Sequence, residues 1–332
     1  MTNPNITFVC CVEAGYLEEQ SLCMIESLRK FGGSFSGSPI IAVKPRFGPP
    51  INKKLLKKFV QLGVLFVDEA IKTNYSWFKF LNKPIALVIA EKHAKTECMC
   101  WLDSDIFIVS EPEQLTLKPT EEFAGFPVED KEMGTAGDGD AYEMLWKEFC
   151  KVLDIDIDSL PWITATETGE KVRMYFNGGI FVYRRNTNFS QKYLDTCIKL
   201  LDAKFGSDLS SYNVGLKEMS SIGFVAHKQM LNIRHLPYSH DYVMLSYTHS
   251  SWYKESNLKS AKVVHYHDSM WPHFYNTFLD CLKKTHPTVA SWVETKGPLK
   301  INLPFHWRLL SAVLRRLRKR AETKYNTSCT KL

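Results

Sequence analysis

Short, nearly continuous apolar runs alternate with helical patterns through the first third of the chain. The apolar runs cover residues 6–12, 39–43, 64–67 and 98–102. Runs of this kind are typical of strands buried on both faces of a parallel sheet. The intervening residues 17–31, 51–62 and 83–95 each place their apolar side chains on roughly one stripe of a helix. This alternation predicts right-handed βαβ units and an α/β fold with an open, mixed but mostly parallel sheet flanked by helices.

The pattern becomes less regular after residue 110. We expect a helix over 141–153, a strand over 173–183, a helix over 190–204, alternating strands and turns over 222–243, and a buried strand over 262–266. The sequence has no internal repeat and no hinge rich in Gly, Ser or Pro. We therefore predict one domain over residues 1–295, with halves of about 1–110 and 111–295, and a separate tail over 296–332.

The composition is that of a globular protein, with 45% hydrophobic and 23% charged residues in a chain of 332. No apolar run approaches the roughly 20 residues that span a bilayer. Residues 6–12 have no basic segment before them, so we interpret this run as a first strand and not as a signal peptide. The nine cysteines have no metal-type spacing, which is typical of buried thiols in a reducing compartment. These features predict a cytoplasmic protein.

The net charge of +6 is concentrated at one end of the chain. Residues 296–332 contain ten Lys or Arg residues and one acid, Glu322, which gives a local charge of +9 and leaves −3 for the remaining 295 residues. A mildly acidic body argues against a nucleic-acid-binding domain with a basic face. The basic tail therefore needs an explanation of its own.

Two carboxylates, Asp103 and Asp105, follow the apolar run 98–102 and precede a second apolar run, 106–109. In an extended backbone, residues two apart project to the same side. The pair would lie near the carboxyl end of a parallel strand, where open α/β sheets bind ligands. Two buried carboxylates repel each other, and a divalent cation such as Mg²⁺ or Mn²⁺ removes that conflict. The alternative is a pair of solvated acids just past the end of a strand.

Two later segments also bring polar groups to strand ends. Asn177, Gly178 and Gly179 begin an apolar strand, and paired glycines there indicate either a bulge or a ligand close to the backbone. His265 lies at the end of the expected strand 262–266. Taken alone, His265 is either a hydrogen-bonded core residue or a ligand.

The order of four segments resembles the GT-A-fold nucleotide-sugar glycosyltransferases. These segments begin at Leu102 (LDSD), Phe176 (FNGG), His227 (HKQM) and Val263 (VVHYH). The sequence is most similar to the group of glycogenin and the bacterial lipooligosaccharide galactosyltransferases, family 8, over roughly residues 5–275. The resemblance implies a GT-A fold with a donor half before residue 110 and an acceptor half after it.

The resemblance also implies an activity and a set of site residues. The enzyme would move a hexose, with retention, from a nucleotide-diphosphate sugar, UDP-linked in the first instance, to a hydroxyl of a glycan or glycolipid. Mn²⁺ or Mg²⁺ would be held by Asp103, Asp105 and His265. The donor would contact Tyr16, Lys83, Asp103, Ser104, Asn177, Gly178 and Gly179. Catalysis would involve Lys83, Asp105 and Gln229, with Gln229 beside the reacting carbon, although Lys228 and Met230 stand where the group has aspartates.

Residues 305–320 of the tail form a two-faced helical pattern. Trp307, Leu310, Val313, Leu314 and Leu317 share one face at 100° per residue, and basic residues occupy the other. A basic amphipathic helix with an aromatic residue indicates binding to an anionic membrane surface. The protein would then be peripheral on the inner face of a membrane. The alternative is a terminal helix packed on the body with a solvated basic side.

Three other functional classes compete with the glycosyltransferase interpretation. A nucleotidyltransferase should have a Gly-rich, Arg-containing loop after the first strand, where this chain has Glu13-Ala-Gly-Tyr16. A dehydrogenase needs Gly-x-Gly-x-x-Gly after that strand, and the chain lacks it. A catalytically inactive protein of the same fold, which binds a sugar nucleotide or serves as a scaffold, stays open as the alternative.

Overall fold

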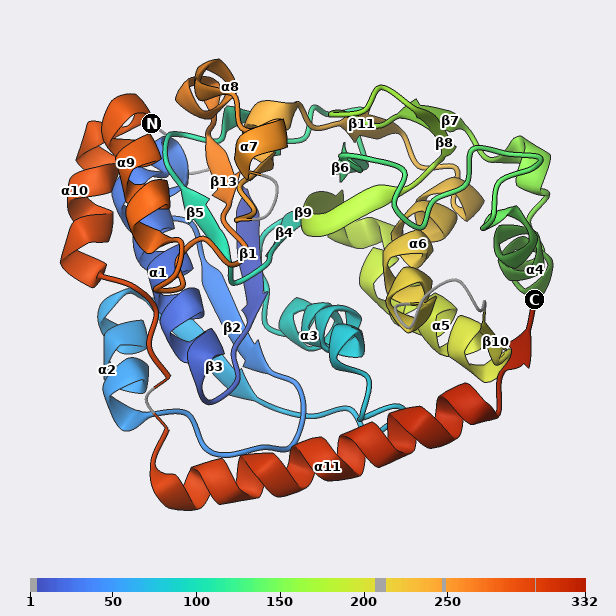
Figure 1. Ribbon diagram of the computed structural model, residues 1–332, viewed down its shortest axis with the longest axis horizontal. Coiled ribbons are helices and arrows are strands. Elements are labelled where there is room, and N and C mark those ends of the chain that lie inside the picture. The colour runs from blue at the N-terminus through green and yellow to red at the C-terminus, as the bar shows by residue number, and fades with distance from the viewer. Residues whose placement is uncertain (1–4, 207–212, 247–248, 302) are drawn as a thin grey trace.

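The computed structural model describes residues 5–206, 213–246, 249–301 and 303–332 (Figure 1). Within these residues, the largest sheet has seven strands in the order β11-β6-β9-β4-β1-β2-β3. β9 is antiparallel to its neighbours β4 and β6, and the other neighbouring pairs are parallel. The strands are β1 (Ile6–Cys11), β2 (Ile40–Lys44), β3 (Val64–Asp68), β4 (Cys98–Leu102), β6 (Phe123–Pro127), β9 (Phe176–Arg184) and β11 (Ile233–His235). The predicted mixed, mostly parallel sheet is confirmed.

Helices cover both faces of this sheet because alternate residues of its buried strands point to opposite sides. Cys98 and Cys100 of β4 belong to a core with α1 and α2, whereas Met99 and Trp101 belong to a core with α3, α4, α5 and α6. The helices are α1 (Tyr16–Phe31), α2 (Lys53–Gln61), α3 (Asn82–Glu91), α4 (Glu143–Leu153), α5 (Phe189–Asp202) and α6 (Asn213–Lys228).

A second, three-stranded sheet packs beside the first, in the order β12-β13-β5. Its strands are β5 (Ile106–Ile108), β12 (Tyr242–Val243) and β13 (Val263–His265), and β13 runs antiparallel to β5. A third core, which includes Phe107, Phe278 and Trp292, lies between this sheet and the helices α8 (Glu255–Ser260), α9 (Tyr275–Thr285) and α10 (Pro287–Lys296), and the short helix α7 (His249–Trp252) precedes them. The chain passes from the first sheet to the second through residues 103–105.

The structure corrects two of the expected elements. The expected strand 173–183 is divided into β8 (Lys171–Arg173), which pairs with β7 (Trp162–Thr164), and β9, which begins at Phe176. The expected strands and turns over 222–243 begin instead as the second half of helix α6. Residues from Leu216 to Ala226 are buried around most of the helix, so α6 lacks the polar stripe by which an amphipathic helix is distinguished from buried strands.

The tail forms one long helix and returns to the body of the molecule. Helix α11 (Phe305–Thr327) crosses the outside of the fold, and β14 (Thr330–Lys331) then pairs with β10 (Phe205–Gly206) (Figure 1). Among the described residues, no helix combines the length and hydrophobicity required to span a bilayer.

Candidate active site

A polar cavity with a volume of about 650 Å³ lies where the two sheets meet. It is lined by the ends of β1 and β4, the starts of α1, α3 and β9, the middle of α6, and the end of β13. Of the ten predicted site residues, nine line this cavity: Tyr16, Lys83, Asp103, Ser104, Asp105, Asn177, Gly178, Gly179 and His265. The cavity therefore brings together segments that are far apart in sequence.

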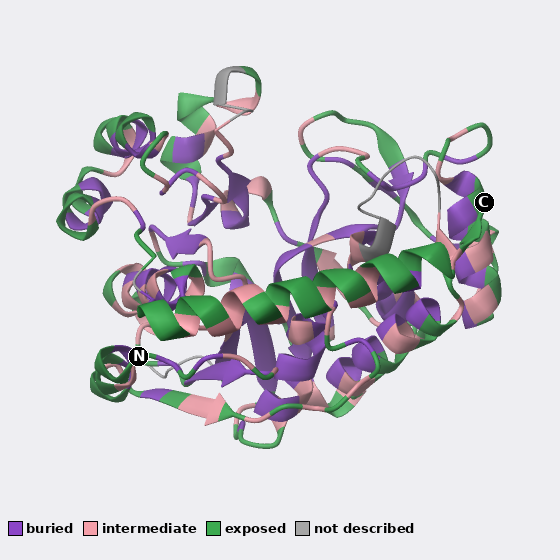
Figure 2. Cartoon of the chain, turned by 60° about the horizontal axis from the view of Figure 1, so that its bottom comes forward, coloured by how far each residue is buried: buried purple, intermediate pink, exposed green. Residues whose placement is uncertain are grey.

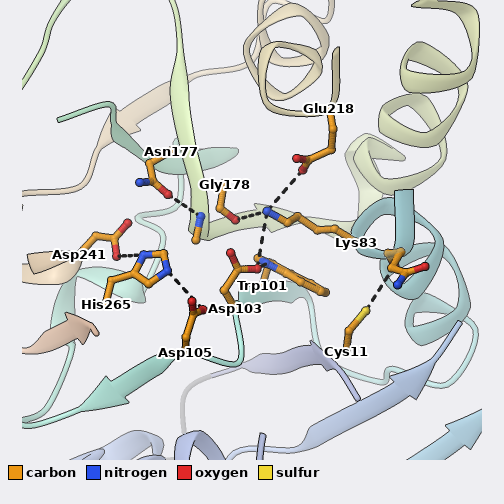
Figure 3. Close-up of polar contacts among 12 residues, drawn as sticks. Cys11, Lys83, Trp101, Asp103, Asp105, Asn177, Gly178, Glu218, Asp241 and His265 are labelled. Atoms are coloured by element: carbon orange, nitrogen blue, oxygen red, sulfur yellow. Dashed lines mark hydrogen bonds and ion pairs between the residues drawn. The ribbon is translucent and has the colours of Figure 1, made fainter. Parts of the chain in front are cut away.

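The turn between β4 and β5 directs Asp103 and Asp105 to different partners (Figure 3). Asp103 accepts a hydrogen bond from Trp101 Nε1 (2.7 Å), and its carboxylate lies 3.6 Å from Lys83 Nζ. Asp105 instead faces the His265 imidazole, with Oδ1 3.4 Å from Nε2. The sequence predicts an extended backbone through both aspartates, but β4 ends at Leu102 and the pair lies in the following turn.

The two carboxylates differ in their affinity for a proton. Burial raises the pKa of Asp103 to about 6, because it outweighs the attraction of Lys83. Burial also acts to raise the pKa of Asp105, but the adjacent His265 outweighs it and holds this pKa below its usual range. Asp105 is therefore the carboxylate that stays ionised as the pH falls.

Lys83 connects three elements around the cavity. Its ammonium group donates to the carbonyl oxygen of Gly178 (2.7 Å) and lies 3.4 Å from Glu218 Oε1, on helix α6 (Figure 3). Burial acts to lower the pKa of Lys83, but Asp103 and Glu218 together outweigh it and raise the pKa above the ordinary value. A permanent positive charge thus faces the cavity beside Asp103.

His265 is held between two carboxylates. Its Nδ1 lies 3.1 Å from Oδ1 of Asp241, which is completely buried, so the Nδ1–H donates to this carboxylate and Nε2 faces Asp105. Burial acts to lower the pKa of His265, but Asp241 and Asp105 outweigh it and raise the pKa. The ring of His267 stacks on that of His265 at 3.8 Å.

Asp105, His265 and His267 form a candidate metal site. One potential ligand atom from each lies within 4.8 Å of the others. Burial and the neighbouring His265 lower the pKa of His267 to about 3, so its imidazole is neutral and offers a lone pair at physiological pH. The resemblance implied Asp103, Asp105 and His265 as ligands, whereas in the structure His267 joins Asp105 and His265, and Asp103 faces Lys83.

The two glycines of β9 make room for the charged side chains. A Cβ atom on Gly178 would lie 2.5 Å from Lys83 Nζ, and one on Gly179 would lie 2.5 Å from His265 Cε1. The carbonyl oxygen of Gly179 also accepts a hydrogen bond from the Asp103 amide (2.9 Å). A side chain at position 179 would thus displace the His265 ring, and one at position 178 would displace the ammonium group of Lys83.

Asn177 links β9 to a buried carboxyl group. Its amide nitrogen donates to Glu129 Oε1 (2.8 Å), and its side-chain oxygen accepts from the Gly179 amide (2.7 Å). Burial, assisted by the charge of Asp241, raises the pKa of Glu129 to about 8. Tyr16 also lines the cavity; the residue is 46% exposed, and the centroid of its ring lies 6.0 Å from that of Trp271.

The structure does not bring Gln229 to this cavity. Helix α6 continues to Lys228, so Gln229 follows the end of the helix, about 16 Å along its axis from Glu218. The Gln229 side chain accepts a hydrogen bond from Lys192 Nζ (2.9 Å) and lines a separate cavity with Leu153. Glu218 is the carboxylate that α6 places beside Lys83.

Four polar residues that line or support the cavity were not predicted from the sequence: Glu129, Glu218, Asp241 and His267. A signal existed for Glu218, since a charged residue within a largely apolar helix is rarely buried without a partner. His267 also carried a signal, because it stands two residues after His265. Nothing local in the sequence distinguishes Asp241 from a solvated acid.

Comparisons with known proteins agree with this architecture. The family described as the Rhodobacterales glycosyltransferase domain matches residues 8–211. The apo structure of the bifunctional glycosyltransferase WbbM has a TM-score of 0.51 at 12% identity, over 90% of this chain and 52% of WbbM. The chain therefore spans about half of the WbbM chain. A comparison with curated proteins gives no match.

Two further solved structures are similar to this chain. GlyE of Streptococcus pneumoniae TIGR4, in its apo form, has a TM-score of 0.49 at 13% identity, over 90% of this chain and 66% of GlyE. The galactosyltransferase LgtC, in complex with donor and acceptor sugar analogues, has a TM-score of 0.47 at 11% identity, over 91% of this chain and 99% of LgtC. The GT-A fold expected from the sequence is confirmed by the likeness to WbbM.

Proposed function

The chain belongs to the Rhodobacterales glycosyltransferase domain family and is a glycosyltransferase, and we propose that it moves a hexose from a UDP-sugar to a hydroxyl of a glycan or glycolipid, with the help of Mn²⁺ or Mg²⁺. The observation that carries the proposal is the convergence of Asp105, His265 and His267 on one wall of a cavity that also contains Asp103 and Lys83. A cluster of this kind suits a pyrophosphate, because a cation and an ammonium group can share its charge.

The residues at the candidate metal site fit a divalent cation. The hydrogen bond from His265 Nδ1 to Asp241 fixes the imidazole so that Nε2 is available to a metal, which is the usual support for a histidine ligand. Two imidazoles and one carboxylate form a softer set than the all-oxygen set preferred by Mg²⁺, which favours Mn²⁺. When bound, the ion would neutralise the negative charge that develops on the departing diphosphate.

Lys83 would act on the same charge from the other side. Its ammonium group is held by the Gly178 carbonyl and by Glu218, and its raised pKa keeps it protonated at neutral pH. Positioned cations of this type lower the barrier for loss of a charged leaving group without a proton transfer. We assign Asn177, Gly178 and Gly179 to the wall along the donor sugar, and Tyr16 to the nucleotide end.

Retention of anomeric configuration is part of the proposal, but Gln229 has no role in it. Gln229 lies about three helical turns from Glu218 and lines a separate cavity, which argues against a place beside the donor sugar. On α6, the group that faces the cavity is Glu218, which pairs with Lys83 and accepts a hydrogen bond from Tyr193. We therefore place Glu218 among the groups that surround the donor sugar.

The proposal is tested with a panel of nucleotide sugars, in the presence and absence of Mn²⁺. We expect one UDP-sugar to raise the melting temperature only with Mn²⁺ and to be slowly hydrolysed, because a ligand that binds the folded state stabilises it. Asp105→Ala should abolish both effects and keep the fold, whereas Asp138→Ala should change neither, because the Asp138 side chain is exposed and does not line the cavity.

The other outcomes identify the alternatives. Binding of a nucleotide sugar without any turnover would favour an inactive protein of the same fold. Equal activity of the wild type and Asp105→Ala would refute the metal assignment.

A further inference from the structure

Helix α11 lies on the outside of the molecule and is fixed at both ends. Before it, buried Leu303 accepts a hydrogen bond from Arg308 Nε (2.6 Å). Near its end, Tyr325 is buried, accepts from Lys217 Nζ (2.6 Å) and donates to the carbonyl oxygen of Leu201 (2.8 Å). Figure 2 shows α11 crossing the face that is turned forward, with most of its outer side exposed.

The exposed side of α11 carries an apolar stripe. Phe305 is 74% exposed, and Leu309, Val313 and Leu317 are 52 to 54% exposed. These four residues are spaced by four, so each is a neighbour of the next on the helix surface. The helical pattern of the sequence predicts Val313 and Leu317 on the same face as Leu310 and Leu314. In the structure Leu310 and Leu314 are half-buried, and the helix leaves the stripe in solvent.

Basic side chains flank the stripe. Exposed residues of α11 include Arg308, Arg315, Arg316, Lys319 and Arg320. The single acid of the helix, Glu322, is partly covered and pairs with Lys319 at 3.1 Å. The outer face of α11 therefore combines exposed apolar groups with positive charge that is hardly offset within the helix.

Two exposed apolar residues lie close to this helix: Ile301 in the sequence and Phe47 in space. Ile301 precedes α11 and is 53% exposed. Phe47, in the loop after β2, is 69% exposed, and its carbonyl oxygen accepts a hydrogen bond from Arg318 (2.7 Å). The same loop contains Arg46, which lines the active-site cavity. The loop after β2 therefore contacts both α11 and the active-site cavity.

We propose that the outer face of α11 binds an anionic lipid surface, with the stripe inserted among the acyl chains and the basic residues among the headgroups. This is the arrangement by which amphipathic helices lie in a membrane interface, and each Lys or Arg near an anionic leaflet adds to the attraction. A second copy of the chain is a poorer occupant, since a twofold contact would set the same positive charges against each other. A nucleic acid would use the arginines but leave the stripe in water.

Sedimentation of the full chain with vesicles tests the proposal. The vesicles contain phosphatidylcholine alone, or phosphatidylcholine mixed with phosphatidylglycerol. The first variant removes the stripe through Leu309→Ser, Val313→Ser and Leu317→Ser, and the second removes charge through Arg315→Gln, Arg316→Gln, Lys319→Gln and Arg320→Gln. The matched control removes four exposed charges from α2 through Lys53→Gln, Lys54→Gln, Lys57→Gln and Lys58→Gln. All of these side chains are exposed, so we expect every variant to fold.

We expect the wild type and the α2 control to bind only the vesicles that contain phosphatidylglycerol. This binding should weaken as salt is added, because salt screens the attraction between the charges. Each α11 variant should bind at least about tenfold more weakly. Wild type that stays in solution with anionic vesicles would overturn the proposal. An α2 control that loses binding as much as the α11 charge variant would also overturn it. So would a dimer in light scattering that both α11 variants dissociate, because the occupant would then be a second copy.

Discussion

Nδ1 of His265 lies 3.1 Å from Oδ1 of Asp241, a carboxylate that is completely buried and reaches the site from the segment before β12. The pair fixes the imidazole so that Nε2 points to Asp105. Asp241 supports the candidate metal site through His265 and is therefore a positioning residue.

Asp241→Asn should weaken Mn²⁺ binding by about 10- to 100-fold, the usual effect of losing the carboxylate behind a histidine ligand. The amide oxygen can still accept from Nδ1–H, so we expect the fold to be kept. Titration of Mn²⁺ in the presence of UDP measures the affinity, and circular dichroism checks the fold. An unchanged Mn²⁺ affinity would show that Asp241 has only a structural role.

The structure and the resemblance differ in the third metal ligand, which is His267 in the structure and Asp103 in the resemblance. His267→Ala should reduce Mn²⁺ affinity, because His267 lies in the cluster with Asp105 and His265. Asp103→Asn should reduce it less, because Asp103 faces Lys83 and Trp101. The same Mn²⁺ titration compares the two variants. The opposite order of the two effects would restore the ligand set that the resemblance implies.

Gly179 is not a metal ligand, but Gly179→Ala should weaken metal binding because it displaces His265. The added methyl group would meet His265 at 2.5 Å from Cε1 and 2.7 Å from Nδ1, so the ring must move away from Asp241 or from Asp105. Gly48→Ala is the matched control, because nothing lies within 4 Å of a Cβ atom there. Mn²⁺ affinity equal to that of the control would show that the imidazole tolerates the displacement.

Glu129 should make stability depend on pH. Its pKa is raised from 4.5 to about 8 by burial, so between these values the folded chain holds a proton that the unfolded chain has lost. This contribution to stability is complete below the unfolded pKa and is lost as the pH rises towards the folded pKa. Glu129→Gln imitates the protonated acid and keeps an acceptor for Asn177.

The free energy of unfolding of the wild type should therefore fall relative to that of Glu129→Gln between about pH 5 and about pH 8. Denaturant unfolding of both proteins across this range measures the difference. The raised pKa of Asp103 also lowers the free energy of unfolding as the pH rises. Because both proteins contain Asp103, its effect cancels in the comparison. A constant difference across the range would contradict the assignment.

Local patterns predicted the first third of the fold well, because strands such as β1 and β4 are buried on both faces and the helices between them are amphipathic. Helix α6 was partly missed because burial around it leaves no polar stripe to reveal its period. The place of Gln229 beside the reacting carbon came from the resemblance alone, and the structure puts this residue after the end of α6, where it lines a separate cavity. Asp241 joins the site through the pairing of β12 with β13, a relation between segments about 20 residues apart that no local pattern records.

A long helix that is fixed at both of its ends cannot move away from the body of the protein as a flexible tail would. Leu303 and Arg308 fix the start of α11, and Tyr325 together with the β14–β10 pairing fixes its end. A lipid surface that binds this helix would consequently set the tilt and height of the whole molecule above the bilayer. The enzyme would then meet its acceptors by sliding in the plane of the leaflet, at one constant distance from it.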